Sequence, residues 1–274
     1  MPVISISCLS YSLGERLVHD VAEQLGYDRL GEEVFKEAAA SMGVPVEKMH
    51  RALEEAPSFF GMSVEARLKC LAHFSAVLAK MLLSDDVLYE GPFGHHIIKG
   101  VSHVFKARIT ASKADRAAHL AKEAAITIHD AGQRIEKADK KRLMAAHLLF
   151  GADDDDQENF DLIINTSKMD AQAAVAVLCE AVSQRRYRPM TYSIGCLKDL
   201  ELASRVKALI SGLAPRAQVQ ARSGNIKINA GGIGGKGKKK LEALRKKIED
   251  ESGVSSVEIE FGGDLTDQLI GKFR

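Results

Sequence analysis

The sequence carries almost no net charge, because 38 lysines and arginines are balanced by 37 aspartates and glutamates among its 274 residues. A formal charge of +1 produces no overall field that would attract nucleic acid or an anionic membrane surface. Any such role would depend on a local patch of charge. The sequence as a whole therefore gives no strong signal for nucleic-acid binding.

Cysteines are few, and their spacing lacks the usual motifs. The four, Cys8, Cys70, Cys179 and Cys196, are far apart and form no CxxC pair. This spacing excludes a zinc knuckle and gives no indication of a disulfide framework. We expect reduced thiols, as in most cytosolic proteins, and the cysteines predict no metal site.

Long apolar runs are also missing. The longest apolar helical pattern, residues 64–83, is interrupted by Glu65, Arg67, Lys69, His73 and Lys80. A membrane-spanning helix needs about 20 mostly apolar residues, so we expect no membrane span. The chain also opens on a strand-like run instead of a basic segment followed by an apolar one, so we expect no signal peptide and a cytoplasmic location.

What the sequence does contain is an alternation of apolar strand-like runs and amphipathic helical patterns. Strands separated by helices favour a mostly parallel sheet covered on both faces. We therefore predict a three-layer α/β domain over residues 1–183. The basic, irregular stretch 184–197 is interpreted as a linker. Residues 198–262 predict a small α+β domain, and 263–274 a tail.

The N-terminal segment has the strand–loop–helix order of a phosphate-binding loop. An alternating run at residues 3–7 is followed by the loop CLSYSLGER and by a helix with Leu17, Val21 and Leu25 on one side. Phosphate loops rely on glycines that let successive N–H groups point at phosphate oxygens, aided by the N-terminus of the next helix. This loop has one glycine and no lysine. The segment therefore has the strand–loop–helix order of a phosphate-binding loop without its usual glycines and lysine.

Several stretches, taken together, resemble the cytidylate-kinase-like branch of the nucleoside monophosphate kinases. They are VISIS with its loop and helix, a strand ending at Gly91, HVFKARITASKADR, IEKADKKR and FDLIINTSKMD. The resemblance covers residues 3–182 in the family's order. It implies a P-loop kinase fold that binds ATP with Mg²⁺ and transfers a phosphoryl group to a nucleotide or a related small acceptor.

The resemblance assigns the donor phosphates to the loop after the first strand. The implied nucleotide-binding residues are Ser10, Tyr11, Ser12, Leu13, Gly14, Glu15, Arg16, Arg116 and Lys140. Tyr11 and Leu13 stand where the family has glycines, and a leucine does not readily adopt a positive φ. Glu15 stands where the family has a basic residue, and Arg16 follows one place later. Pro92 replaces an arginine of the family and lacks an N–H donor. These departures indicate weakened phosphate binding.

The segment QRIEKADKKR resembles the family's lid. The resemblance implies catalytic roles for Arg16, Arg134, Asp139 and Arg142. Phosphoryl transfer depends on positioning and charge neutralisation, which arginines over the transferring group supply. Without the family, the same run is typical of a solvated helix with ion pairs three and four residues apart, and Asp139 and Arg142 lie on one helical face.

The stretch GGIGGKGKKK matches GxxxxGK from Gly232, but Lys239 stands where a Ser or Thr is required. Only one helix and one strand follow it, too few for a mononucleotide-binding fold. We expect a flexible basic connection whose residues Lys236 to Lys240 can bind an anionic or protein partner. The surrounding pattern resembles a BON-type domain, which implies a binding or self-association module and includes a homo-oligomer among the alternatives.

Three further candidates have simpler explanations. His95 and His96 follow a central strand, but adjacent helical residues point in different directions, so we do not expect a shared metal ion. Residues 153–156 are four aspartates without the ligand spacing of a calcium loop, which favours a solvated loop. Glu90, at the end of a strand, is better placed as a magnesium ligand, although a metal role is the less favoured interpretation.

Three functions remain open from the sequence. The first is an ATP-dependent, cytidylate-like nucleoside monophosphate kinase. The second is a kinase-like protein with impaired catalysis that binds nucleotide or acts as a scaffold or regulator through its C-terminal module. The third is a dimerising structural protein without a ligand. The altered loop favours the second function, whereas the basic lid favours the first.

Overall fold

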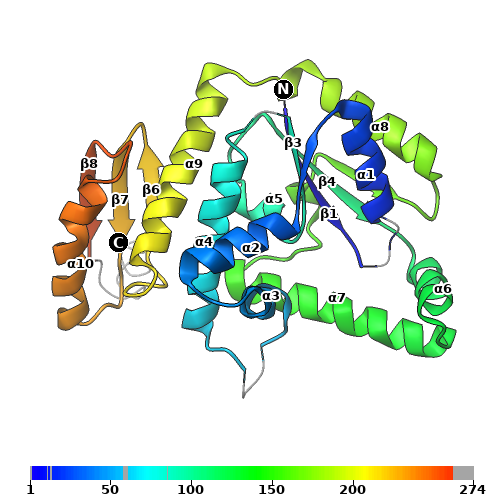
Figure 1. The fold of residues 1–274 in the computed structure, drawn as a ribbon, viewed down its shortest axis with the longest axis horizontal. Coiled ribbons are helices and arrows are strands. Elements are labelled where there is room, and N and C mark those ends of the chain that lie inside the picture. Colours follow the sequence, from blue (N-terminus) through cyan, green and yellow to red (C-terminus); the bar gives the residue numbers. More distant parts are fainter. Residues whose placement is uncertain (1, 11, 13, 58–60, 85, 262–274) are drawn as a thin grey trace, which may run out of the picture. The chain divides into compact units, whose positions relative to one another are not determined.

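The computed structural model describes residues 2–10, 12, 14–57, 61–84 and 86–261 (Figure 1). The chain divides into two compact units, one formed by residues 1–34, 53–61 and 84–194 and the other by 35–52, 62–83 and 195–274. No helix within the described ranges is both long and apolar enough to cross a bilayer.

The first unit contains a five-stranded, fully parallel sheet. Its strands are β1 (Val3–Cys8), β2 (Asp28–Leu30), β3 (Val87–Glu90), β4 (Val104–Thr110) and β5 (Leu162–Asn165). They are arranged in the order β2-β3-β1-β4-β5, so the N-terminal strand lies at the centre. The predicted α/β class with a mostly parallel sheet is confirmed. The short edge strand β2 was not predicted, because three residues show no alternation.

The helices between these strands include α1 (Gly14–Leu25), α5 (Gly94–Ile97), α6 (Lys113–Ala124), α7 (Ile128–Phe150) and α8 (Ala171–Ser183). Short 3₁₀ turns, η1 (Gln157–Asn159) and η2 (Arg185–Tyr187), lie before β5 and after α8. Helices α1 and α8 pack on one face of the sheet, where Leu17 and Leu178 contact Ile4 and Ile6 in one buried core.

The other face of the sheet is more polar. Side chains alternate between the faces of a strand, so Ser5 and Ser7 of β1 face away from the core that holds Ile4 and Ile6. Gly94 of α5 lies against Ser5 so closely that a side chain at this position would collide with the Ser5 hydroxyl. Ser7 lies next to the carboxyl end of β1, and ligands of α/β proteins bind at the carboxyl ends of the strands.

Helices α6 and α7 form a packed pair that carries most of the predicted lid residues. Each has a hydroxyl cap: Ser112 Oγ accepts from the Asp115 N–H (3.1 Å), and Thr127 Oγ1 accepts from the Asp130 N–H (3.0 Å). The two helices bury a small apolar cluster of Ala117, Leu120, Ala131 and Ile135. This packing fixes the position of α7 against α6, so the lid segment is an ordered helix.

The second unit contains α3 (Val46–Glu54) up to Ala52, most of α2 (Glu32–Met42), all of α4 (Val64–Met81) and a C-terminal module. Helix α4 begins at Ser63, whose Oγ accepts from the Ala66 N–H at 3.2 Å. Arg67 of α4 is 1% exposed and donates to the carbonyl oxygens of Arg51 (3.3 Å) and Ala52 (3.0 Å). These two bonds connect α4 to α3.

The C-terminal module consists of α9 (Thr191–Ile210), β6 (Gln218–Arg222), β7 (Asn225–Asn229), α10 (Gly235–Glu249) and β8 (Ser256–Glu260). Strands β6 and β7 are antiparallel, and β8 lies parallel to β7. The hairpin turns at Ser223 and Gly224, which have φ values of 49° and 83°, as a two-residue hairpin turn requires. The predicted small α+β module is confirmed as a mixed three-stranded sheet with its own buried core.

Helix α9 begins earlier than the sequence suggested. We expected an irregular linker over residues 184–197 and a helix from Leu197, but η2 and the start of α9 at Thr191 occupy much of that stretch. Ser193 Oγ accepts from the Met190 N–H at 3.1 Å, which stabilises the first turn after Pro189. The assignment of domain boundaries at 183 and 198 stays a prediction.

Candidate functional site

The loop between β1 and α1 is partly described. Ser10 is exposed, whereas the Ser12 side chain is buried and its Oγ has no hydrogen-bond partner among the described residues. Thr166 Oγ1 donates to the Ser12 carbonyl at 3.0 Å, which ties the loop to the end of β5. Gly14 opens α1 against Cys8, and a Cβ at this position would lie 2.8 Å from the Cys8 Cβ. Tyr11 and Leu13 lie outside the described residues.

The first turn of α1 carries charges of both signs. Glu15 and Arg16 are both exposed. An acidic side chain in the first turn stabilises the helix, but it also opposes an anionic ligand at the same N–H groups. Arg16 lines an open groove of about 770 Å³ between α1 and α8, together with Asp20, Glu23 and Val175. This groove lies on the face of the sheet that α1 and α8 cover.

The carboxyl ends of β1 and β3 are acidic instead of basic. Arg29 donates to Glu90 Oε2 at 2.7 Å, so the residue considered as a magnesium ligand forms an ion pair. Burial raises the pKa of Glu90, and the nearby charge of Glu15 raises it further against the opposing effect of Arg29. Burial likewise raises the pKa of the Cys8 thiol, and the charge of Glu90 adds to that effect. A triphosphate would meet two carboxyl groups here.

Arg116 connects the loop to the lid helix. Its side chain is 3% exposed, and its Nε donates to the Ser10 carbonyl oxygen at 2.8 Å. The other two nitrogens donate to both oxygens of Asp139 on α7, at 2.9 and 2.7 Å. Three predicted site residues, Ser10, Arg116 and Asp139, are therefore brought together. In this arrangement the arginine's charge is neutralised by a paired carboxylate.

The remaining predicted lid residues separate. Arg134 and Lys140 are exposed on α7. Arg142 forms ion pairs with Asp154 and with Asp155 Oδ1 (2.7 Å), both on the loop after α7. Asp139 pairs with Arg116, whereas Arg142 pairs with Asp154 and Asp155. The predicted lid residues Asp139 and Arg142 thus belong to two different groups.

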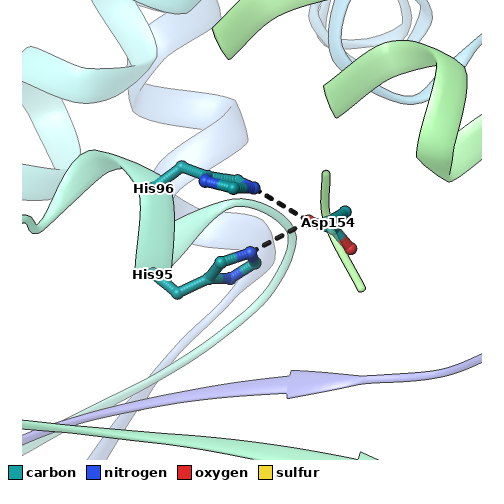
Figure 2. Close-up of side chains that lie close together, drawn as sticks. All are labelled: His95, His96 and Asp154. Carbon is teal, nitrogen blue, oxygen red and sulfur yellow. Dashed lines mark hydrogen bonds and ion pairs between the residues drawn. The ribbon is translucent and has the colours of Figure 1, made fainter. Parts of the chain in front are cut away.

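A buried polar cluster surrounds Asp154, which is itself 1% exposed. Arg108 of β4 donates to Asp154 Oδ2 at 2.7 Å and to Ser7 Oγ at 3.2 Å. His95 Nε2 lies 2.9 Å from Asp154 Oδ1, and His96 Nε2 lies 3.2 Å from the same oxygen. Figure 2 shows both imidazole rings pointing at this single carboxylate. The cluster contains more charged and polar contacts than any other buried group that we describe.

The electrostatics of this cluster favour an ionised aspartate beside a neutral histidine. Burial alone would raise the pKa of Asp154, but its contacts with His95 and His96 and the charge of Arg108 outweigh it and hold that pKa well below its usual range. Burial lowers the pKa of His95 to about 4, against the opposing effect of Asp154. At neutral pH, His95 is therefore an uncharged imidazole that contacts a carboxylate.

Two expectations about this cluster were wrong. The adjacent histidines do not diverge: on the short helix α5, which follows Phe93 with its φ of 62°, both rings point at Asp154 (Figure 2). The four aspartates are not a uniformly solvated loop, because Asp154 is buried while Asp155 is half-exposed. One signal was present in the sequence: Arg108 interrupts an apolar central strand, and a buried arginine requires a carboxylate partner.

Comparisons with known proteins agree with this fold. Residues 3–168 match the model of the cytidylate kinase-like family, and the chain belongs to that family. It is 24% identical over 189 residues to a cytidylate kinase of Methanopyrus kandleri, covering 66% of this chain and 92% of that one. It is 24% identical over 185 residues to a cytidylate kinase of Thermococcus kodakarensis, covering 66% and 87%.

A solved structure supports the same architecture. An uncharacterised protein from Eubacterium ventriosum superimposes with a TM-score of 0.52 at 16% identity, over 67% of this chain and 99% of that one. At this identity the similarity concerns the fold alone. The C-terminal module extends beyond the 3–168 family match.

Proposed function

We propose that this chain is a kinase-like protein with impaired phosphoryl transfer, which acts by binding, with its C-terminal module as a scaffold or regulatory part. The observation that carries this proposal is the bidentate pair between Arg116 and Asp139. Arg116 touches the predicted phosphate loop, yet its two terminal nitrogens are occupied by a carboxylate. An arginine engaged in this way offers little free charge to a phosphate.

The charges around the loop support the same proposal. The loop contains no lysine, and Glu15 lies in the first turn of α1. Glu90 adds a second carboxyl group at the neighbouring strand end. Kinases of this type neutralise a highly charged transferring group with lysine, arginine and metal ions. Here the two carboxyl groups offset the positive charges of Arg16 and Arg29.

An active ATP-dependent, cytidylate-like kinase is the second candidate. Membership of the family and the contact between Arg116 and the Ser10 carbonyl favour it. In this function ATP and Mg²⁺ bind at residues 10–16, and Arg16, Arg134 and Arg142 approach the transferring group. A triphosphate would then have to displace Asp139 from Arg116.

The C-terminal module is proposed to act as a BON-like binding or self-association part. Its order of one helix, a hairpin, a second helix and a parallel strand supports this proposal. Lys236, Lys238, Lys239 and Lys240 are exposed at the start of α10. A lysine cluster of this kind suits an anionic partner.

Calorimetric titration with ATP and Mg²⁺, with CMP, dCMP and other monophosphates added in turn, tests the proposal together with a coupled turnover assay. We expect no turnover in the natural chain. As a matched comparison, the combined substitutions Tyr11→Gly, Leu13→Gly and Glu15→Lys restore the residue types usual in the family, and ATP affinity should rise. Turnover of CMP by the natural chain, abolished by Arg116→Ala, would instead establish the kinase.

A further inference from the structure

The cluster around Asp154 has a feature that ion pairing alone does not require. The Nε2 atoms of His95 and His96 both face one oxygen, Asp154 Oδ1, while Oδ2 is held by Arg108 and Arg142 (Figure 2). The three potential ligand atoms lie within 4.8 Å of one another, and all three residues are buried. Two nitrogens and one oxygen thus converge on a single point inside the first unit.

The distances suit a shared ion. Ligands about 2.0–2.1 Å from a tetrahedral zinc ion lie about 3.3 Å from each other. His95 and His96 lie 2.9 and 3.2 Å from Asp154 Oδ1, close to that spacing. In addition, His96 Nε2 is buried and, despite its 3.2 Å approach, makes no hydrogen bond of acceptable geometry within the described part of the chain. A metal ion would give this buried nitrogen a partner.

We propose that His95 Nε2, His96 Nε2 and Asp154 Oδ1 bind a divalent transition-metal ion of the zinc type, with one coordination position open to an anionic oxygen ligand. Two imidazoles and one carboxylate form a ligand set that suits zinc and its neighbours better than Mg²⁺ or Ca²⁺, which prefer oxygen. The site is thus distinct from any magnesium bound with a nucleotide.

The surrounding charges support both parts of this proposal. Arg108 and Arg142 hold Asp154 Oδ2, so they orient the carboxylate to present a single oxygen, as partners of ligating carboxylates do. Asp154 and Asp155 together cancel the charges of the two arginines. The two charges of the ion would therefore be left uncompensated, and an anion such as phosphate in the open position would reduce this excess of positive charge.

The first experiment is a metal titration of the full chain. After dialysis against a chelator, Zn²⁺ is titrated in competition with a chromophoric chelator, and bound metal is measured by elemental analysis. We expect one tightly bound equivalent. His95→Gln and His96→Gln should each weaken binding on the order of 100-fold or more. Circular dichroism and thermal melting of each apo variant verify that the fold is retained.

The chain offers a matched control. His19, Asp20 and Glu23 on α1 also lie within metal-binding distance of one another, but they are more exposed. His19→Gln should leave the affinity unchanged. The absence of a stoichiometric Zn²⁺ equivalent in the natural chain would overturn the proposal, as would binding that is lost in His19→Gln and retained in the folded His95 and His96 variants.

The open position is tested with Co²⁺ in place of Zn²⁺. A four-coordinate cobalt site absorbs visible light, and the spectrum responds to an exchange of ligand. Adding inorganic phosphate should shift this spectrum, with a saturable dependence on concentration, and chloride at equal ionic strength should not reproduce the shift. A cobalt spectrum that phosphate leaves unchanged would overturn the anionic position. Because these readouts require no kinase activity, they are independent of whether the chain transfers phosphate.

Discussion

Arg116 and Arg142 each pair with an aspartate, yet the two aspartates lie in different environments. The side chain of Asp139, the partner of Arg116, is 29% exposed, whereas that of Asp154, a partner of Arg142, is 2% exposed. If its arginine leaves, Asp139 is still partly solvated, whereas Asp154 stays in a buried site. We therefore expect a ligand to release Arg116 from Asp139 more easily than Arg142 from Asp154, because leaving a buried carboxylate unpaired costs more free energy.

Asp154→Asn should cause the largest loss in the free energy of unfolding. This change leaves Arg108 and Arg142 without their shared buried charge, and breaking a buried ion pair costs about 3–5 kcal/mol. Urea unfolding at neutral pH, with the chelated apo protein, measures the loss in the free energy of unfolding.

Asp155→Asn is the matched control for that prediction. The Asp155 side chain is 53% exposed, so its ion pairs should contribute less than about 1 kcal/mol. Equal losses for the two variants would contradict the view that burial separates the two arginine groups.

Acid should lower the free energy of unfolding through the buried His95. The pKa of His95 falls from 6.5 to about 4 on folding, so the unfolded chain binds more protons between these values. The free energy of unfolding therefore falls as the pH decreases from 6.5 to 4, by on the order of 2–3 kcal/mol from this residue. Asp154, His96 and Arg108 are the charged or titratable groups facing His95, and the lowered pKa of Asp154 extends the loss below pH 4.

Thermal or urea unfolding across this pH range, again on apo protein, tests the direction. In His95→Gln the slope between pH 6.5 and 4 should become smaller. A slope that is unchanged in this variant would show that other groups cause the acid sensitivity.

Arg116→Ala should cause an intermediate loss in the free energy of unfolding. The change removes the bond to the Ser10 carbonyl and the bidentate pair with Asp139, and leaves the half-buried carboxylate unpaired, which should cost about 1–3 kcal/mol. Arg134→Ala, on the exposed side of α7, should stay within about 0.5 kcal/mol of the natural chain. If both variants unfold at the same urea concentration, Arg116 does not hold the loop to α7.

The smallest effect on stability is expected for Asp139→Asn. Arg116 is buried, but Asp139 is partly solvated and an asparagine keeps an oxygen that can accept from Arg116, so the loss should be about 1 kcal/mol. The change frees the charge of Arg116 near the loop, so pyrophosphate or ATP should bind more tightly than to the natural chain, by about tenfold if roughly 1.4 kcal/mol of pairing is released. Calorimetry measures this gain, and an unchanged affinity would mean that Asp139 does not mask Arg116.

Much of the fold followed from local pattern. Alternating apolar residues at β1 and the amphipathic stripe of α1 predicted elements that the structure contains, because these signals arise from neighbours within a few residues. The β2 edge strand and the early start of α9 were missed, because a three-residue strand and a capped turn after proline have little periodicity.

The structure brings some of the candidate site residues together, and their roles stay predictions. The resemblance placed Ser10, Arg116 and Asp139 in one site, and the structure brings these three together. It did not place Asp154 with His95, which lies 59 residues away in sequence. The sequence by itself determined the order of the strands and helices and the charges available at their ends. Only the tertiary structure decided which carboxylate each arginine meets and which of them is buried, because both depend on contacts between segments that no local periodicity links.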